Sequence, residues 1–229
     1  MRTPGKADRL LSPMTPARRR QFDTISAGLA RLVRYDDESV VHEQWIRQRY
    51  DGGYAQTYQP ARIAAVITAW HEAGHAVAAL ATGARFSSAS IRHSATSAGR
   101  VHAITSGGQE AFVIHAAGQI AERLRDWTTL DEDGDLAAWL KSWRDDGGDA
   151  RHFRAAIKPA SGSTAEMAAW RDAEQILTPR RLQIRQLARA LLIDPRYLPY
   201  EVCQAIYLAA PYQAGNESSE SRTTSAPAS

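Results

Sequence analysis

The chain has 229 residues, of which 44% are hydrophobic and 23% are charged. This composition is normal for a soluble globular protein, and the length suits one good-sized domain or two small ones. The formal net charge of +3 is too small to indicate nucleic-acid binding by itself, and no apolar run approaches the roughly 20 residues of a membrane-spanning helix. With a single cysteine and no apolar signal segment, we expect a cytoplasmic protein without disulfides or thiolate metal sites.

The ends of the chain differ in composition from its middle. Residues 1–20 hold six basic residues, three prolines and one acid, which predicts a disordered basic arm. A solvated arm is favoured over one that contacts nucleic acid or a membrane. Residues 21–58 predict one or two helices of an N-terminal accessory segment, and residues 59–210 form the main domain. Residues 211–229 are too polar to bury a core and predict a disordered tail.

The first half of the main domain predicts two helices separated by strands. Apolar residues recur at helical spacing over 61–82, and Gly83 is a stop signal. The segments 85–94 and 99–106 show rough alternation around turn residues, which predicts two short strands. A second helix is predicted over 109–127, with its apolar residues on one face.

The second half of the main domain is predicted to be helical. After the acidic loop DEDGD at 131–135 comes a short helix at 136–143, and DDGGD breaks it. Thr178 before Pro179 predicts the start of a new helix, with one long kinked helix as the alternative. A short last helix covers 197–209. The fold class is therefore mainly α, with a small β-sheet of two or three short strands.

The stretch AWHEAGHAVAAL, within the first of these helices, contains a metal-binding pattern. His71 and His75 are one turn apart on the same helix face, so both imidazoles can reach one ion. Glu72 is rotated by about 100 degrees from His71 and lies beside that ion, where its carboxylate can accept a proton from water. This is the H-E-x-x-H arrangement of zinc peptidases. Two ordinary surface histidines are the alternative, but the apolar flanks predict burial, which is costly for unpaired polar groups.

Two histidines do not complete a catalytic zinc site, since three protein ligands are usual. The acidic loop is a candidate source of the third ligand. A calcium loop is an alternative use of it, although its glycine does not fit the EF-hand pattern. The other candidates are single histidines and glutamates: His93, His102, His115, Glu110 and Glu122.

The order of motifs resembles the FtsH-type zinc peptidases, family M41. AAVITAWHEAGHAVAAL resembles that family's zinc helix, and HAAGQIAERL its following small-residue helix. DGDLAAWLKSW resembles its Asn-Asp-Leu segment, although Gly134 replaces the asparagine. WRDAEQILTPRRLQIRQLARALLIDPRYLPYEVCQAI resembles the C-terminal helical region, which Pro179 interrupts here. The resemblance covers about residues 60–208 and implies a zincin-like helical metallopeptidase domain at 59–210.

The resemblance also assigns roles to individual residues. It implies that His71 and His75 are zinc ligands and Glu72 is the general base. It implies Asp135 as the third ligand, with Asp133 or Asp131 as substitutes. Glu122 matches a glutamate expected to orient a ligand, and a solvated helix residue is the alternative. His115 is on the same helix, where a satisfied core or surface histidine is favoured over a role in the site.

The predicted function is that of a zinc-dependent metalloendopeptidase. The chain has no phosphate-binding loop of the type G-x-x-x-x-G-K-[ST], so we expect ATP-independent cleavage of flexible or unfolded polypeptides. An edge strand within 99–105 is expected to hold the peptide by strand addition. Two alternatives stay open: a catalytically weak zinc module that regulates or binds peptides, and a peptidase subunit served by a separate ATPase. A homo-oligomer is also open, and neither a membrane span nor a nucleic-acid partner is expected.

Overall fold

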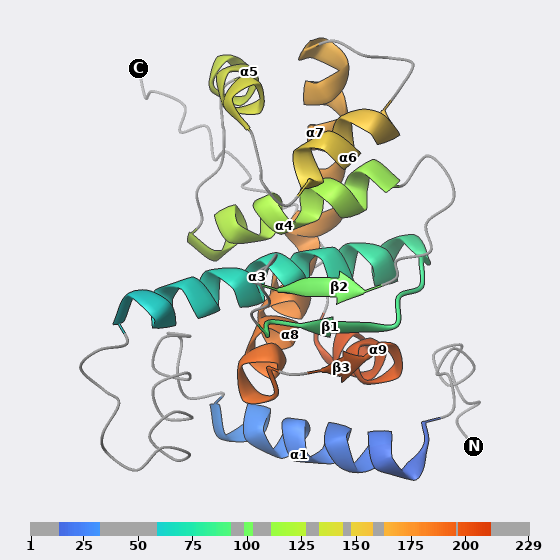
Figure 1. Cartoon of the computed structure of the whole chain (residues 1–229). Coiled ribbons are helices and arrows are strands. Elements are labelled where there is room, and N and C mark those ends of the chain that lie inside the picture. Colours follow the sequence, from blue (N-terminus) through green and yellow to red (C-terminus); the bar gives the residue numbers. More distant parts are fainter. Residues whose placement is uncertain are drawn as a thin grey trace, which may run out of the picture.

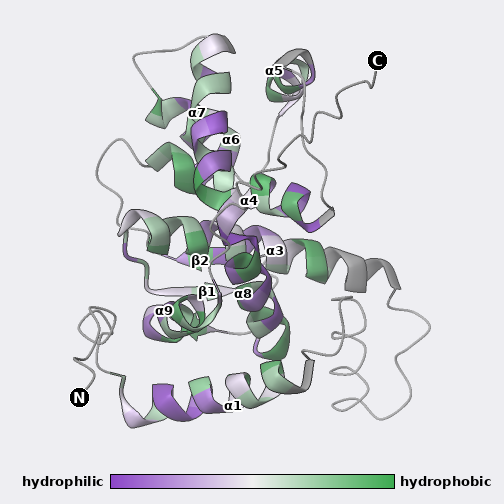
Figure 2. Cartoon of the chain, turned by 180° about the vertical axis from the view of Figure 1, so that it is seen from behind, coloured by the Kyte–Doolittle hydropathy of each residue, from purple (hydrophilic) through white to green (hydrophobic). Residues whose placement is uncertain are grey.

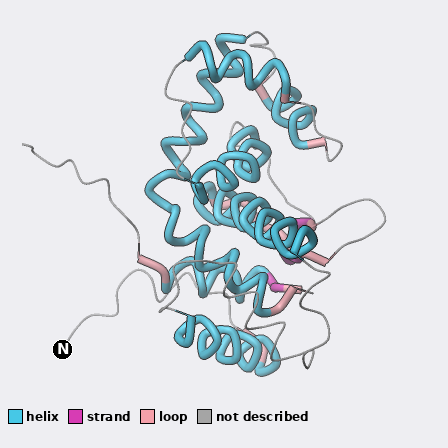
Figure 3. Tube along the Cα trace, turned by 90° about the vertical axis from the view of Figure 1, so that its left-hand side faces the viewer, coloured by secondary structure: helices cyan, strands magenta, loops and turns pink. Residues whose placement is uncertain are grey.

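The computed structural model describes residues 14–32, 59–92, 99–102, 111–126, 133–143, 148–157, 163–195 and 197–211. In these ranges the protein is mainly helical with a small three-stranded antiparallel sheet, which confirms the predicted fold class (Figure 1). The side view in Figure 3 shows how short the strands are beside the helices. The helices predicted within 33–58 and the predicted tail from 212 onward lie outside the described residues. Within the described ranges, no helix is both long and apolar enough to cross a membrane.

Two antiparallel helices form the centre of the fold. They are α3 (Gln59–Thr82) and α4 (Ala111–Asp126), and both confirm helices predicted from the apolar spacing. They approach closely at Gly74, where a Cβ atom would lie 2.6 Å from the Cβ of Ala121 and overlap the Ala117 carbonyl. Glycine is therefore required at this crossing despite its cost within a helix. Gly83 ends α3 with φ 78°, a left-handed conformation.

The sheet lies beside α3 and contains both predicted strands. These are β1 (Ser88–Ser90) and β2 (Arg100–His102), and a third strand, β3 (Leu198–Pro199), completes the order β2-β1-β3. All pairs are antiparallel, with Ala89 opposite both Val101 and Leu198. The sequence placed residues 198 and 199 in the last helix. Pro199 instead has extended backbone, with φ −60° and ψ 154°, and α9 (Tyr200–Ala209) begins after it.

The C-terminal helices pack across the central pair. After α7 (Ser163–Leu177), a 3-10 turn at Thr178–Arg180 leads into α8 (Arg181–Ile193). No side-chain cap bond forms at the start of the turn or of α8, so the kinked long helix describes this region better than a newly capped one. The proline permits a helix-like path but removes a backbone donor. α8 contributes the fully buried side chains of Ile184, Leu187, Leu191 and Leu192 to the core.

Two short helices lie beyond α4, with α6 (Asp149–Ala156) packed against α4 and α5 (Asp133–Ser142) packed against α7. α5 begins three residues before its predicted start, and α6 was not predicted, since its first residue was assigned to a helix break. Buried Trp143, Trp170 and Phe153 pack between them and α7. Arg154 links the two short helices by donating to the Leu140 carbonyl at 2.6 Å. These contacts determine where α6 meets the central pair.

The N-terminal helix α1 (Pro16–Leu32) belongs to the packed fold. It takes in residues 16–20, which the sequence placed in the disordered arm. Thr15 supplies the start signal, because its Oγ1 accepts the backbone N–H of Arg18 at 3.3 Å and Pro16 follows it. Hydrophilic and hydrophobic residues alternate along α1, as in an amphipathic helix (Figure 2). Its apolar side buries Ile25, which is 1% exposed.

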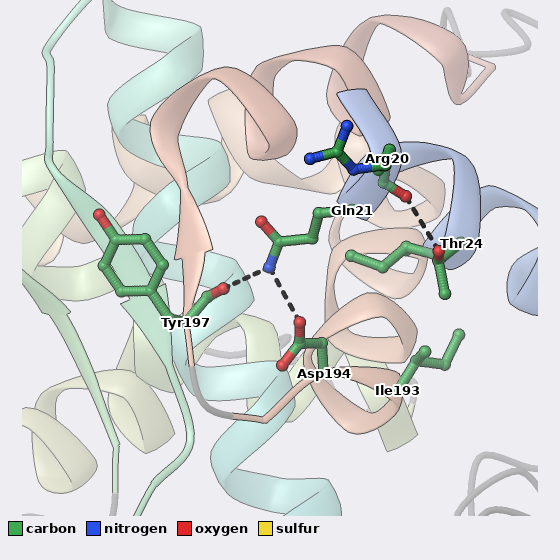
Figure 4. Close-up of a pocket in the computed structure, with 7 residues that line it drawn as sticks. Arg20, Gln21, Thr24, Ile193, Asp194 and Tyr197 are labelled. Carbon is green, nitrogen blue, oxygen red and sulfur yellow. Dashed lines mark hydrogen bonds between the residues drawn. The ribbon is translucent and has the colours of Figure 1, made fainter. Parts of the chain in front are cut away.

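Polar contacts attach α1 to the C-terminal region. Gln21 Nε2 donates to Asp194 Oδ2 at 2.9 Å and to the Tyr197 carbonyl at 2.7 Å (Figure 4). Arg18 also pairs with Glu201 on α9 at 2.6 Å. α1 therefore braces the segment that leads into β3.

We expect the substitution Ile25→Ala to lower the free energy of unfolding by about 2 to 4 kcal/mol, because it leaves a cavity under α1. Urea denaturation measures this change. The exposed Asp23→Ala on the same helix is the control and should change stability by less than about 0.5 kcal/mol. Equal small effects of both substitutions would show that α1 does not pack on the core.

Candidate metal centre

The centre of α3 presents three ionisable side chains to the interior. Glu72 and His75 are buried, and His71 is half-buried. The Nε2 atoms of the two histidines lie 3.0 Å apart, with ring centroids separated by 4.7 Å. Two ring nitrogens converge in this way when one cation, or a shared proton, lies between them. The predicted helix thus brings His71, Glu72 and His75 together.

The opposite nitrogen of each ring has a partner on α4. His71 Nδ1 lies 2.7 Å from Glu122 Oε1, and His75 Nδ1 donates to the Ile114 carbonyl at 2.6 Å. These contacts leave both Nε2 atoms for a ligand, and they fix the ring orientations as second partners of metal-binding histidines do. Glu122 thus contacts a ring nitrogen of His71, and its role as an orienting carboxylate stays a prediction.

Gly118 allows α4 to lie against the His71 ring. A Cβ atom at this position would come within 2.5 Å of the ring's Cε1 and Nε2 atoms. Any larger residue would displace the imidazole or separate the helices. The spacing of the two helices is thus part of the geometry of the centre.

Asp149 completes a three-residue group. Its Oδ2 lies 3.0 Å from His71 Nε2 and 3.2 Å from His75 Nε2. One ligand atom from each residue lies within 4.8 Å of the others, so the group could hold a metal ion. Two imidazole nitrogens and one carboxylate oxygen suit zinc, and three protein ligands leave a coordination position open. The donor chemistry of this structure therefore fits zinc.

The acidic residue in this group is not the one expected from the sequence. Asp135 is exposed in the first turn of α5 and is absent from the group. Its proposed substitute Asp133 begins α5, and Asp131 lies outside the described residues. Asp149 reaches the histidines because Gly148, with φ 93°, turns the chain into α6. The sequence DDGGD at 145–149 predicted only a helix break, so Asp149 was not among the candidate ligands.

Glu72 lies beside the group, where a general base is expected. Its side chain is almost entirely buried, with the residue 6% exposed. Burial raises the pKa of Glu72, while the charges of His75 and His71 and a backbone hydrogen bond from Val101 act in the opposite direction. The carboxylate therefore has a stronger tendency to take up a proton than an exposed glutamate.

The three side chains of the group, His71, His75 and Asp149, strongly affect one another's pKa values. Burial lowers the pKa of His71, but hydrogen bonds with Asp149 and Glu122 and the Glu72 charge outweigh it and raise this pKa to about 10. Burial raises the pKa of Asp149, and the His75 charge and both histidine hydrogen bonds reverse this effect, so it is strongly lowered. The protein without an ion therefore keeps a proton on the histidine pair facing an ionised Asp149.

His115 lies close to this group without belonging to it. Its ring centroid is 5.1 Å from that of His152 on α6. Burial, followed by the His152 charge, lowers the pKa of His115 to about 4. His115 is therefore an uncharged neighbour of the centre at neutral pH, and its assignment as a satisfied core or surface histidine stays a prediction.

Comparison with known proteins supports a metallopeptidase-like segment. Residues 53–124 match the family described as Peptidase M50B-like, a zinc metallopeptidase family. The matched segment takes in α3, β1, β2 and most of α4, and it ends before α6. This match does not support the more specific resemblance to FtsH-type peptidases. No curated protein and no solved structure matches the chain.

We expect Asp149→Ala to abolish stoichiometric zinc binding, because it removes the carboxylate from the three-residue group. Asp135→Ala is the matched control, since it deletes an exposed aspartate on the neighbouring helix. Metal analysis of the purified, zinc-loaded variants separates the two. Zinc retained in Asp149→Ala and lost in Asp135→Ala would reverse this ligand assignment.

Zinc binding at pH 7 should release protons, about one or more per ion. His71, with a pKa of about 10, is protonated there without metal, whereas a ligand nitrogen must be unprotonated. The apparent zinc affinity should fall as the pH is lowered, by about tenfold per pH unit for each proton released. Calorimetry in buffers of different ionisation enthalpy measures the release. A binding enthalpy independent of buffer would contradict it.

Proposed function

We propose that the protein is a zinc-dependent metalloendopeptidase that cleaves flexible or unfolded polypeptides in the cytoplasm. The observation that carries this proposal is the convergence of two imidazole nitrogens and the Asp149 carboxylate, with the buried carboxylate of Glu72 directly beside them. A purely structural ion needs no adjacent base, so the position of Glu72 favours an enzyme over a zinc-stabilised binding module. The match of residues 53–124 to a metallopeptidase family supports the same chemistry.

Each residue of the centre has a part in this proposal. His71, His75 and Asp149 would hold zinc, which when bound supplies Lewis acidity toward water and toward the scissile carbonyl. Glu72 accepts the proton of the attacking water and passes it to the leaving amine. Glu122 and the Ile114 carbonyl keep the two imidazoles in the orientation that leaves Nε2 for the ion.

The sheet supplies a surface for an extended substrate. β2 is an edge strand, because it pairs with β1 alone in the described sheet. Its outer side faces Glu72, so a peptide strand added at this edge would lie next to the proposed base. Strand addition requires an extended segment, which favours flexible or unfolded polypeptides as substrates. No nucleotide-binding loop occurs in the sequence, so we propose cleavage without ATP.

The more specific relationship to FtsH-type peptidases is part of this proposal as well. The order of motifs along residues 60–208 supports it, whereas the matched family is M50B-like. Both are families of zinc peptidases, so the proposed chemistry depends on neither assignment. A separate ATPase would extend the substrate range to folded proteins.

We expect Glu72→Gln to reduce cleavage of unfolded casein by at least about a hundredfold, since the amide cannot accept the proton. Zinc content should stay at the wild-type level, because Glu72 is not in the three-residue group. Glu166→Gln, on α7 in a pair with Arg154, is a control that should retain activity. If the zinc-loaded wild type cleaves neither casein nor flexible peptides, the protein is a zinc-containing binding module.

A further inference from the structure

The edge strand β2 contacts the side chain of Glu72 at two points. The backbone N–H of Val101 donates a hydrogen bond to its carboxylate. The backbone at Gly99, just before the strand, lies against its stem. The strand thus restrains the proposed base both by a hydrogen bond and by a close backbone contact.

Strand geometry explains why the Val101 N–H is directed to this side. The His102 carbonyl accepts the backbone N–H of Ser87 at 2.9 Å, so residue 102 has its backbone groups directed toward β1. Neighbouring residues of a strand direct their backbone groups to opposite sides. Those of Val101 therefore point away from β1, toward the open edge where Glu72 lies.

The contact at Gly99 tolerates no side chain. A Cβ atom there would lie 2.8 Å from Glu72 Cγ and 2.9 Å from its Oε1, and 2.7 Å from Thr68 Cγ2. Real Cβ atoms do not approach other atoms this closely, so an added methyl group must push either the strand or Glu72. Gly99 is itself buried.

We propose that Gly99 and Val101 are positioning residues for Glu72, and that β2 thereby sets the direction of the carboxylate relative to His71 and His75. The inference deepens the proposed peptidase function and rests on it. A buried glutamate side chain can still adopt several rotamers. The contact of Gly99 with the aliphatic part of Glu72 and the hydrogen bond from the Val101 N–H together select one of them. Displacement of a reacting group by about 1 Å can reduce the rate about a hundredfold, so such a restraint matters for catalysis.

The hydrogen bond can be tested without any enzymatic assay. In the zinc-loaded protein, the amide of Val101 should be protected from hydrogen exchange by NMR. Glu72→Ala should remove this protection, while the amide of Ser87, which bonds within the sheet, keeps its own. Equal protection of Val101 in both proteins would overturn the proposal, because another acceptor would then hold this strand.

The positioning role can be tested by a compensated substitution. Gly99→Ala should reduce kcat on unfolded casein by about 10- to 100-fold with KM and zinc content unchanged. Adding Thr68→Ser removes Cγ2, the nearest atom that the new methyl group meets. The methyl group can then move away from Glu72, and kcat should recover at least threefold. Thr68→Ser alone should have wild-type activity.

The outcomes separate this proposal from the proposed function. Loss of zinc together with activity in Gly99→Ala would overturn a positioning role, and so would an effect confined to KM. An effect on kcat that persists undiminished in a Glu72→Gln background would also overturn it, because the residue would not act through Glu72. If the wild type has no peptidase activity, the enzyme proposal fails, and the amide protection alone decides whether β2 holds Glu72.

Discussion

The close approach of α3 and α4 is the constraint on which the centre depends. Gly74 lets α3 rest on the backbone of α4, and Gly118 lets α4 rest on the His71 ring. At this spacing a backbone carbonyl and a carboxylate of α4 reach the Nδ1 atoms of the two histidines. A wider spacing would leave buried imidazoles with unpaired polar atoms, which costs several times more than the glycines do. The same close packing at small residues therefore also fixes the orientation of the two histidines.

The rest of the fold places two further elements against this pair of helices. The cluster of Trp143, Trp170 and Phe153 determines the position of α6. In this position the Asp149 carboxylate lies within 3.2 Å of the Nε2 atoms of both histidines. On the other side, β3 and α9, braced by α1, support β1 and through it the edge strand beside Glu72. The centre therefore combines local geometry along one helix with contacts between residues far apart in the sequence. Its concentration of buried charge is tolerable because opposite charges and fixed dipoles face each other.

The parts that sequence predicts well are those determined by local spacing. The helices at α3 and α4, the two short strands and the break at Pro179 follow from periodicity and from glycine and proline signals, as does the grouping of His71, Glu72 and His75. Asp149 could not be selected in this way, because several aspartates precede helices between 131 and 149 and only tertiary packing decides which one reaches the histidines. β3 was missed because a two-residue segment that includes Pro199 forms a strand only when β1 is present as a partner. The start of α1 was predictable, since Thr15 and Pro16 form the same signal that was recognised at Thr178 and Pro179.

The two kinds of metal ligand lie on helices of very different length. The imidazoles lie on a 24-residue helix packed closely against α4. The carboxylate lies at the first residue of an eight-residue helix held by buried Phe153 and by the polar contacts of Arg154. The position of the histidine pair therefore depends on the packing of the two central helices, and that of the carboxylate on the contacts of α6 with its neighbours. A change in the preferred cation would therefore evolve most easily through the residues that position α6. Moving the histidine pair would instead require repacking the two central helices.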